Sequence, residues 1–320
     1  MRLNFMKIAL LDAATLANTD LTPLSELGEL NIHQHTREEQ ILTHSEGADV
    51  IISNKVILNA STLAKLPALK LICVAATGTN NIDLDAAKQL GIRVCNVAGY
   101  STPSVVQHTF TLLGNLMTNI HRYQQDCANG LWQKSNMFCR LDYPITELAG
   151  KNFVIFGHGS LGQAVGKVAE AFGAQVIIAE RPNANTIRSG RTEFTEALKM
   201  ADVLSIHCPL NDETRNLFNK ETLALLKPTS FVINTARGGI VDESALVEIL
   251  KEKLIAGAGF DVLSVEPAQA TNPLANYQGQ NLILTPHTAW AAKESIERLV
   301  NEIAKNIINF THGTPSNVVV

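Results

Sequence analysis

One stretch, residues 151–181, constrains the fold of this 320-residue chain more than any other. The apolar run Phe153–Phe156 predicts a short strand that leads into a turn with glycine at positions 157, 159 and 162. Helical periodicity follows, and a second apolar run, Val176–Ala179, ends on Glu180. The predicted order is therefore strand, glycine turn, helix, strand and acid.

Each glycine of the turn has a mechanical reason in a unit that binds a dinucleotide. Gly157 permits the tight turn, Gly159 lets the backbone approach a pyrophosphate, and Gly162 lets the helix lie close to the strand. The positive end of the helix then points at the phosphates. A glycine-rich surface turn is the alternative, but strand, helix, second strand and acid all fall in place. The remaining turn residues expected at the cofactor are Ser160 and Leu161.

The acid at the end of the second strand bears on the choice of cofactor. Glu180 lies 23 residues after Gly157, about where a carboxylate meets the ribose hydroxyls of a dinucleotide. Such a carboxylate repels a 2′-phosphate, so we expect NAD to be favoured over NADP. Arg181 beside it leaves an alternative open, because its guanidinium could turn toward a phosphate instead of lying in solvent.

Composition and charge exclude several classes of function. The formal net charge is only -4, with 46% hydrophobic and 18% charged residues, so we expect small anions as ligands and neither nucleic acid nor membrane. The apolar run near the start is short and is interrupted by Asp12, which does not fit a signal peptide or a membrane span. The 5 cysteines lack CxxC spacing, which predicts reduced thiols in a cytoplasmic protein and no metal site.

Strand and helix signals alternate on both sides of the glycine turn. Six strands are expected from Phe153 to Leu284, which makes a full doubly wound dinucleotide domain. Four or five βα units before the turn predict a second parallel sheet covered on both faces. The fold class is therefore α/β with two doubly wound domains. The strands expected before the turn are Lys7–Leu11, Leu30–His33, Asp49–Ile52, Lys70–Ala75 and Ile92–Val97.

Three further segments organise the chain. Residues 36–39 have the spacing of a helix capping box, with Thr36 as the cap. Ser101-Thr102-Pro103 predicts the start of a long helix that links the domains. Residues 126–148 carry large apolar groups without a clear period, and they form either a loop over the same subunit or an arm packed on a second one. We expect the final apolar helix, through Ile303, to pack back on the first domain.

Polar residues that follow strands are the candidates for chemistry, since ligands of such sheets bind beyond the carboxyl ends of the strands. Arg237, Glu266 and His287 each follow a predicted strand. An imidazole exchanges a proton near neutral pH, a carboxylate orients it, and a guanidinium grips a carboxylate. Taken singly, each has a structural alternative: a core histidine, a solvated loop acid, or an arginine that binds backbone carbonyls.

The motifs around these residues resemble those of the D-isomer-specific 2-hydroxyacid dehydrogenases. Three signatures occur in order at similar separations, namely Asn234–Gly238, Gly259–Val262 with Glu266-Pro267, and Pro286–Ala289. The segments Ala76–Asp83 and Ser104–His108 also resemble the substrate loop and the start of the linking helix of that family. The resemblance covers nearly the whole chain.

The resemblance implies a role for each matching residue. Arg237 would hold the substrate carboxylate and carbonyl, His287 would donate the proton in reduction, and Glu266 would pair with His287. Backbone amides of a loop in the first domain would bind the carboxylate, at Ala76, Thr77 and Gly78. Arg237 and His287 would also contact the cofactor, NAD. The other implied cofactor contacts are Thr235, Ala236 and Asp261 at the nicotinamide end, with Cys208 and Pro209 near the adenosine.

The resemblance also implies the domain organisation. A flavodoxin-like substrate domain would be discontinuous, with residues 1–100 plus 289–320, and a Rossmann domain would span 101–288 with the linking helix. Homodimers would form through the cofactor domain.

The substrate loop TGTNNID and the arm around GLWQKS look most like the glycerate dehydrogenase, or hydroxypyruvate reductase, branch, which would also take glyoxylate. Phosphoglycerate dehydrogenases often carry a basic residue in the substrate loop, and this loop has none before Gly78. Formate dehydrogenases pair the catalytic histidine with glutamine, which Glu266 argues against. A related fold serves as an NAD-sensing module in transcriptional corepressors, and this non-enzymatic alternative is kept.

Overall fold

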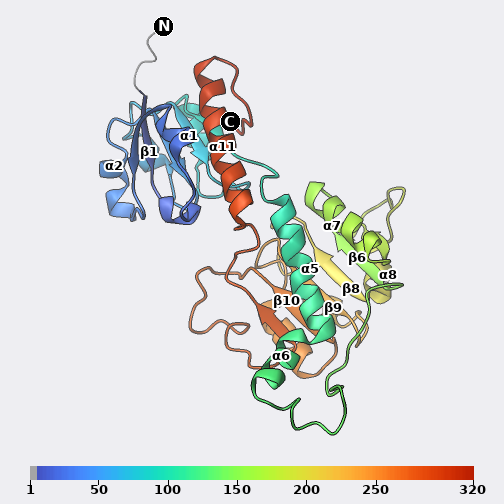
Figure 1. The fold of residues 1–320 in the computed structure, drawn as a ribbon. Helices are drawn as coiled ribbons and strands as arrows, with labels where there is room; N and C mark the ends of the chain where they lie inside the picture. Colours follow the sequence, from blue (N-terminus) through green and yellow to red (C-terminus); the bar gives the residue numbers. More distant parts are fainter. Residues whose placement is uncertain (1–5) are drawn as a thin grey trace. The chain divides into compact units, whose positions relative to one another are not determined.

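The computed structural model describes residues 6–320 and divides into two compact units (Figure 1). The first unit comprises the described residues up to Ser101 together with Ala291–Val320, and the second comprises Thr102–Trp290. The predicted boundaries, after residues 100 and 288, lie close to these. Residues 1–5, which the predicted first domain included, lie outside the described residues.

The first unit is built on a five-stranded parallel sheet with the order β2-β1-β3-β4-β5. This is the flavodoxin-like order. Here β2 is added on one side of β1 and β3 on the other, so the strand order reverses between β1 and β3. Burial on both faces explains the continuous apolar runs of β3 and β4, whose residues are all buried. The strands are β1 (Met6–Leu10), β2 (Gly28–Ile32), β3 (Val50–Ser53), β4 (Leu71–Val74) and β5 (Arg93–Cys95).

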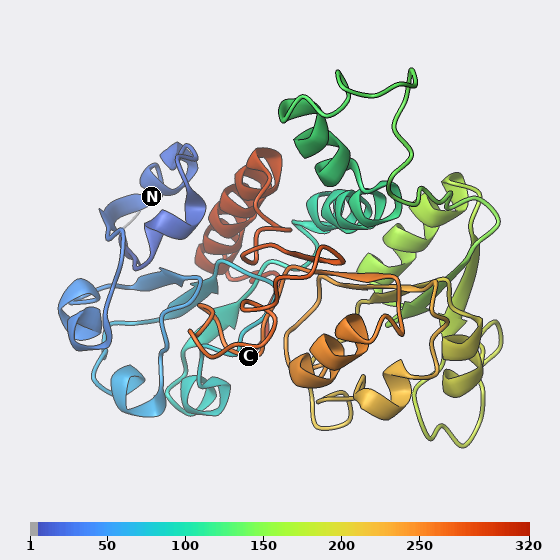
Figure 2. The same ribbon diagram turned by 90° about the horizontal axis from the view of Figure 1, so that it is seen from below.

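Short helices and one long helix cover this sheet. The long helix α11 (Lys293–Thr311) packs against α1 and β4, so the last part of the chain completes the first unit (Figures 1 and 2, red beside blue). Its apolar stripe is buried, including Leu299 and Ile303, each at 0% exposure. The short helices are η1 (Ala13–Leu16), α1 (Thr22–Ser25), η2 (Glu38–Gln40), α2 (Ile41–His44), α3 (Ala60–Leu63) and α4 (Leu84–Gln89).

The predicted capping box at residues 36–39 is wrong by one residue. The cap is Arg37, whose backbone N–H donates to the side chain of Gln40 at 3.1 Å. The hydroxyl of Thr36 instead donates to the carbonyl oxygen of Leu11 at the end of β1. A contact with a distant part of the chain therefore overrides the local capping pattern.

The second unit is built on a six-stranded parallel sheet with the order β11-β10-β9-β8-β6-β7. The chain turns outward from β6 to β7 and then crosses to β8, so the strand order reverses between β6 and β8, where such sheets bind their ligands. The strands are β6 (Asn152–Phe156), β7 (Gln175–Ala179), β8 (Val203–Ile206), β9 (Phe231–Asn234), β10 (Gly257–Phe260) and β11 (Leu282–Leu284). The predicted fold class, α/β with two doubly wound parallel sheets, is confirmed.

Helices cover both faces of this second sheet. Phe153 and Ile155 of β6 belong to one core with α5 and α7, while Val154 and Phe156 belong to the core beneath α8, α9 and α10. This alternation is the two-residue period of a strand. Figure 1 shows α5 and α7 on the same side of the sheet. The helices are α5 (Thr102–Thr118), α6 (Ile120–Ala128), α7 (Ser160–Ala171), α8 (Phe194–Met200), α9 (Lys220–Leu223) and α10 (Glu243–Lys251).

The segment after α6 has neither helix nor strand until β6 begins, and it extends away from the rest of the second unit in both views (Figures 1 and 2, green). Within residues 6–320, no helix is both long and apolar enough to cross a membrane.

Candidate active site

The glycine turn follows β6 at the point where the strand order of the second unit reverses. A side chain at Gly162 would meet the carbonyl oxygen of Gly157 at 2.1 Å, so only glycine lets α7 begin so close to the strand. Gly157 has a φ of +98°, and a side chain there would meet the backbone of Cys208 at 2.5 Å. Gly162 thus lets α7 pack on the turn, and Gly157 lets the turn pack on the backbone that follows β8.

Gly159 differs from its two neighbours, because a side chain there would meet no protein atom within 4 Å. It caps α7, a 12-residue helix without an acidic residue in its first turn, so no carboxylate offsets the positive end of the helix dipole. The space above Gly159 and the helix terminus together fit a pyrophosphate. The turn therefore fits the cofactor that the sequence predicted, with Ser160 and Leu161 in the first turn of α7.

Glu180 follows β7 directly, as expected for the residue at the adenosine ribose. Its side chain is only 1% exposed, however, and its carboxylate accepts hydrogen bonds from Arg188 and from the backbone N–H of Arg181. The hydrogen bonds from Arg188 hold the pKa of Glu180 below its ordinary range. Arg181 is adjacent to Glu180 in the sequence and was expected near it, whereas nothing in the sequence pointed to Arg188.

Cys208 and Pro209 follow β8, the strand next to β6, and the backbone of residues 207 and 208 lies against Gly157. Burial raises the pKa of Cys208 to about 12, so its thiol stays protonated and unreactive at neutral pH. The structure thus places both residues beside the glycine turn, and their contact with adenosine stays a prediction.

Arg237 follows β9 in a turn that is tightly held. The side chain of Asn234, which is fully buried, accepts from the N–H of Ala236 at 3.0 Å and donates to the carbonyl oxygen of Arg237 at 2.9 Å. A side chain at Gly238 would meet the backbone of Leu263 at 1.8 Å, so this turn packs directly on the loop that follows β10. Arg237 itself is exposed, with its charge available to an anion.

His287 and Glu266 form a hydrogen-bonded acid–base pair. The Nδ1 atom of His287 lies 2.6 Å from a carboxylate oxygen of Glu266, whose other oxygen accepts from the N–H of Leu263 at 2.9 Å. Because an ionised carboxylate only accepts, Nδ1 carries a proton and Nε2 is left to face a ligand. His287 has a φ of +54°, a left-handed backbone conformation that is uncommon outside glycine.

Asp261 holds the loop that carries His287. Its carboxylate, 1% exposed, accepts from the N–H groups of Thr288 and Ala289 at 2.9 and 2.8 Å and from the hydroxyl of Thr285. Burial raises the pKa of Asp261, but the hydrogen bonds from His108, Thr285 and the backbone outweigh it, and the net shift is downward. The structure therefore shows Asp261 holding the loop that carries His287, and its predicted contact with the nicotinamide stays a prediction.

The remaining predicted residues lie in two turns. Thr235 and Ala236 are buried directly after β9, and the hydroxyl of Thr235 lies 3.1 Å from that of Thr109. In the first unit, Ala76, Thr77 and Gly78 follow β4, where the hydroxyl of Thr77 donates to the carbonyl oxygen of Val97 at 3.0 Å. This loop is fixed within its own unit, and its binding of a substrate carboxylate stays a prediction.

Sheet register explains how the second unit brings distant residues together. Asn234, Phe260 and Leu284 are directly aligned across β9, β10 and β11, so Arg237, Asp261 and His287 all follow the same edge of the sheet. Sequence reasoning missed the residues that support this edge. Glu243 is one, since it accepts from the N–H of Ser264 at 2.5 Å and from the side chain of Asn272 at 2.7 Å.

The three glycines lead to a prediction that separates binding from stability. We expect Gly159→Ala to weaken NADH binding about tenfold or more while the melting temperature stays unchanged, because the added methyl meets ligand space only. Gly162→Ala should instead cost about 1–3 kcal/mol of stability through overlap with the backbone. Calorimetric titration and thermal unfolding of both variants test this. Gly114→Ala in α5, where a side chain also meets no atom within 4 Å, is the control that should keep NADH affinity.

Comparison with known proteins identifies the family. The model of the D-isomer specific 2-hydroxyacid dehydrogenase, NAD binding domain, matches residues 110–289. The chain is 41% identical over 281 residues to a glycerate dehydrogenase of Methylorubrum extorquens, covering 88% of each chain. It is 36% identical over 322 residues to a hydroxypyruvate reductase of Blautia hydrogenotrophica, covering 98% of this chain and 99% of that one.

A solved structure shares the fold of this chain over nearly its whole length. An acyclic imino acid reductase in complex with NADPH and D-arginine matches with a TM-score of 0.85 and 27% identity, covering 98% of this chain and 100% of that one. The predicted cofactor, NAD, is confirmed by the matching NAD-binding domain. The chain belongs to the D-isomer-specific 2-hydroxyacid dehydrogenases, a family of NAD-dependent oxidoreductases.

Proposed function

We propose that this chain reduces hydroxypyruvate to D-glycerate with NADH, and that it also reduces glyoxylate. The observation that supports this most strongly is the 2.6 Å pair of His287 and Glu266 at the edge of the sheet that also carries Arg237. The names of the two relatives, glycerate dehydrogenase and hydroxypyruvate reductase, favour this substrate within the family.

We assign a task to each of the three residues on the basis of this geometry. Glu266 fixes the proton on Nδ1 of His287 and stabilises the imidazolium, so Nε2 can donate its proton to the oxygen of the substrate carbonyl. Arg237 binds the substrate carboxylate through its planar fork. When bound, NADH supplies the hydride for C2. After reduction, neutral His287 is ready to take a proton from solvent or to act as the base for alcohol oxidation.

Two other functions remain as alternatives. A phosphoglycerate dehydrogenase would take a substrate with a further phosphate, and a corepressor-like module would bind NADH without turnover. Neither has better support, because the acid–base pair is intact and the two relatives above are named for other substrates.

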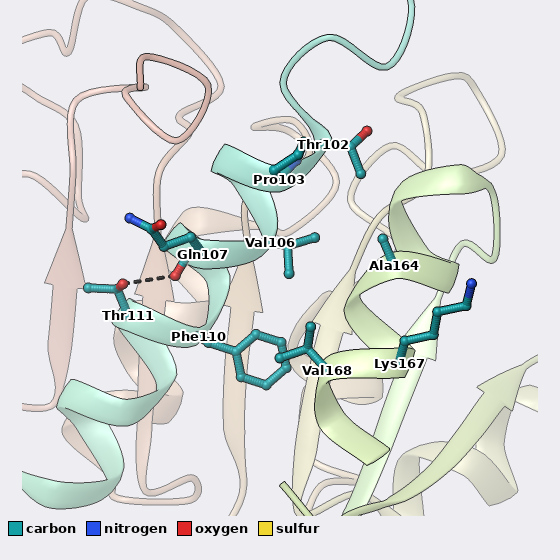
Figure 3. A pocket seen from close by; sticks show the side chains of 9 residues that line it. All are labelled: Thr102, Pro103, Val106, Gln107, Phe110, Thr111, Ala164, Lys167 and Val168. Atoms are coloured by element: carbon teal, nitrogen blue, oxygen red, sulfur yellow. Dashed lines mark hydrogen bonds between the residues drawn. The ribbon is translucent and has the colours of Figure 1, made fainter. Parts of the chain in front are cut away.

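We also propose that two copies associate through the second unit. An apolar groove of about 730 Å³ runs between α5 and α7, and Figure 3 shows Val106, Phe110 and Val168 converging on it. The segment after α6 carries several exposed apolar side chains, of which Phe138 is 91% and Leu141 71% exposed. A two-fold dimer lets the exposed segment of each copy cover apolar surface of the other.

The exposed segment has a defined shape, which suits it to an interface. The indole N–H of Trp132 donates to the carbonyl oxygen of Phe138 at 3.0 Å, and Arg140 pairs with Asp126 at 3.1 Å. The segment thus holds Phe138 and Leu141 in exposed positions. The free cysteines, of which Cys73, Cys95 and Cys208 are buried, support a cytoplasmic location.

The substrate proposal is tested with purified protein, NADH and a panel of 2-keto acids. We expect hydroxypyruvate to give the highest kcat/KM, and Arg237→Lys to lower it about 10- to 100-fold, because a point charge replaces a two-bond fork. Arg93→Lys is the matched control, since Arg93 is exposed at the start of β5 and should keep full activity. Binding of NADH without turnover of any 2-keto acid would favour the interaction module.

The acid–base pair is tested with the pH dependence of kcat/KM in both directions. Glu266→Gln removes the charge that stabilises the imidazolium, so His287 loses its proton more easily. The alkaline limb of hydroxypyruvate reduction and the acid limb of D-glycerate oxidation should both move to lower pH. The surface variant Glu221→Gln should leave both limbs in place. Limbs that move oppositely, or not at all, would show that Glu266 does not act on His287.

The dimer proposal is tested by sedimentation velocity. Phe138→Asp removes no packing within the chain, since Phe138 is 91% exposed, yet it places a charge in the proposed interface. We expect the parent protein to sediment as a dimer and this variant as a folded monomer at the same concentration. Ile57→Asp, a substitution at a residue of the first unit that is 65% exposed, should stay dimeric. A monomeric parent protein would refute the proposal.

A further inference from the structure

The loop between β7 and α8 is folded back on the strand that precedes it. The N–H of Glu180 donates to the carbonyl oxygen of Thr192 at 2.8 Å, and the N–H of Thr192 donates to that of Ile178 at 2.9 Å. Thr192 thereby forms a bridge with Ala179 in the place where a further parallel strand would lie. The two ends of the loop are held together, and the arginines within it are brought to the end of β7.

The carboxylate of Glu180 is already occupied by these arginines. One of its oxygens accepts from Nε of Arg188 at 2.7 Å, and the other accepts from Nη2 of Arg188 and from the backbone N–H of Arg181 at 2.8 Å. Nε of Arg191 lies 3.8 Å from the carboxylate as well. The pair of bonds from Arg188 is the fork geometry in which guanidinium and carboxylate bind most strongly.

The charge that the loop shows to solvent is therefore positive. Glu180 is 1% exposed, whereas the side chain of Arg188 is 51% exposed. The guanidinium groups of Arg188 and Arg191 both lie at the one buried carboxylate, and Arg181, next to it in the chain, is also exposed. A free carboxylate at this position would accept from the ribose hydroxyls and repel a 2′-phosphate, but here it is neutralised by ion pairing and covered by its partner.

We propose that Arg188 makes this site accept a 2′-phosphate, so that the chain uses NADPH as well as NADH. The proposal rests on the proposed function and names its second cofactor. Arg188 acts in two ways: its fork screens the charge of Glu180, and its exposed face attracts the phosphate. Arg181 and Arg191 add positive charge. Glu180 then serves to orient Arg188, and it no longer discriminates against the phosphate.

The test measures dissociation constants of NADH and NADPH by calorimetric titration of the full chain. We expect the two constants of the parent protein to lie within about tenfold of each other. Arg188→Ala should weaken NADPH about tenfold or more and leave NADH unchanged or tighter, because the carboxylate is uncovered. Arg188→Lys keeps the charge without the fork, so its affinity for NADPH should lie between those of the parent protein and of Arg188→Ala. Lys220→Ala removes a cation from α9, 62% exposed, and should change neither constant.

Two further measurements test how charge contributes to the binding of NADPH. Glu180→Gln should bind NADPH at least as tightly as the parent protein, and the affinity for NADPH should fall more steeply with salt than that for NADH. A parent protein that binds NADPH more than about 100-fold more weakly than NADH would overturn the inference. The inference would also be overturned if Arg188→Lys lost affinity for NADH and NADPH by the same factor. Because binding needs no keto acid, a failure to reduce hydroxypyruvate would refute the substrate proposal and leave these results intact.

Discussion

The second unit depends on backbone packing against backbone at positions where no side chain fits. Gly162 brings the start of α7 onto the turn after β6, and Gly238 brings the turn after β9 onto the loop after β10. The first contact shapes the space for the cofactor phosphates, and the second sets Arg237 beside the loop of Glu266. Both follow from the same property, the absence of a side chain, and the second joins the segments that follow the neighbouring strands β9 and β10.

On this edge the buried charges act as positioning groups. Asp261 is inaccessible and binds two backbone N–H groups of the loop that carries His287. Glu243 does the same for Ser264, two residues before Glu266. Ionised groups this deeply buried are costly unless every oxygen is bonded, and each carboxylate here has several donors. The loops of His287 and Glu266 are therefore both held by buried carboxylates, although the side chains of His287 and Glu266 are partly exposed.

Much of this arrangement could be predicted from the sequence. Buried parallel strands are continuous runs of apolar, mostly β-branched residues, which is why the predicted ranges of β3, β4 and β6 lie within two residues of the observed ones. Side-chain contacts between residues that are distant in the sequence could not be predicted. Arg188 lies eight residues after Glu180 in a loop without periodicity, and only the pairing of Thr192 with β7 brings it to the carboxylate. Likewise, Thr36 binds Leu11 in preference to the helix that follows it.

The discontinuity of the first unit has a consequence for how the chain is made. Its edge strand β5 is completed by the last residues, with the N–H of Val94 donating to the carbonyl oxygen of Val320 at 2.8 Å, and β4 is covered by α11. During synthesis the first sheet leaves the ribosome early, yet it must wait for these closing segments with apolar surface uncovered. The second unit is contiguous and has all its strands before α11 is translated. The first unit can therefore complete its fold only after the second unit has been synthesised, and until then its uncovered apolar surface is open to a nascent-chain chaperone.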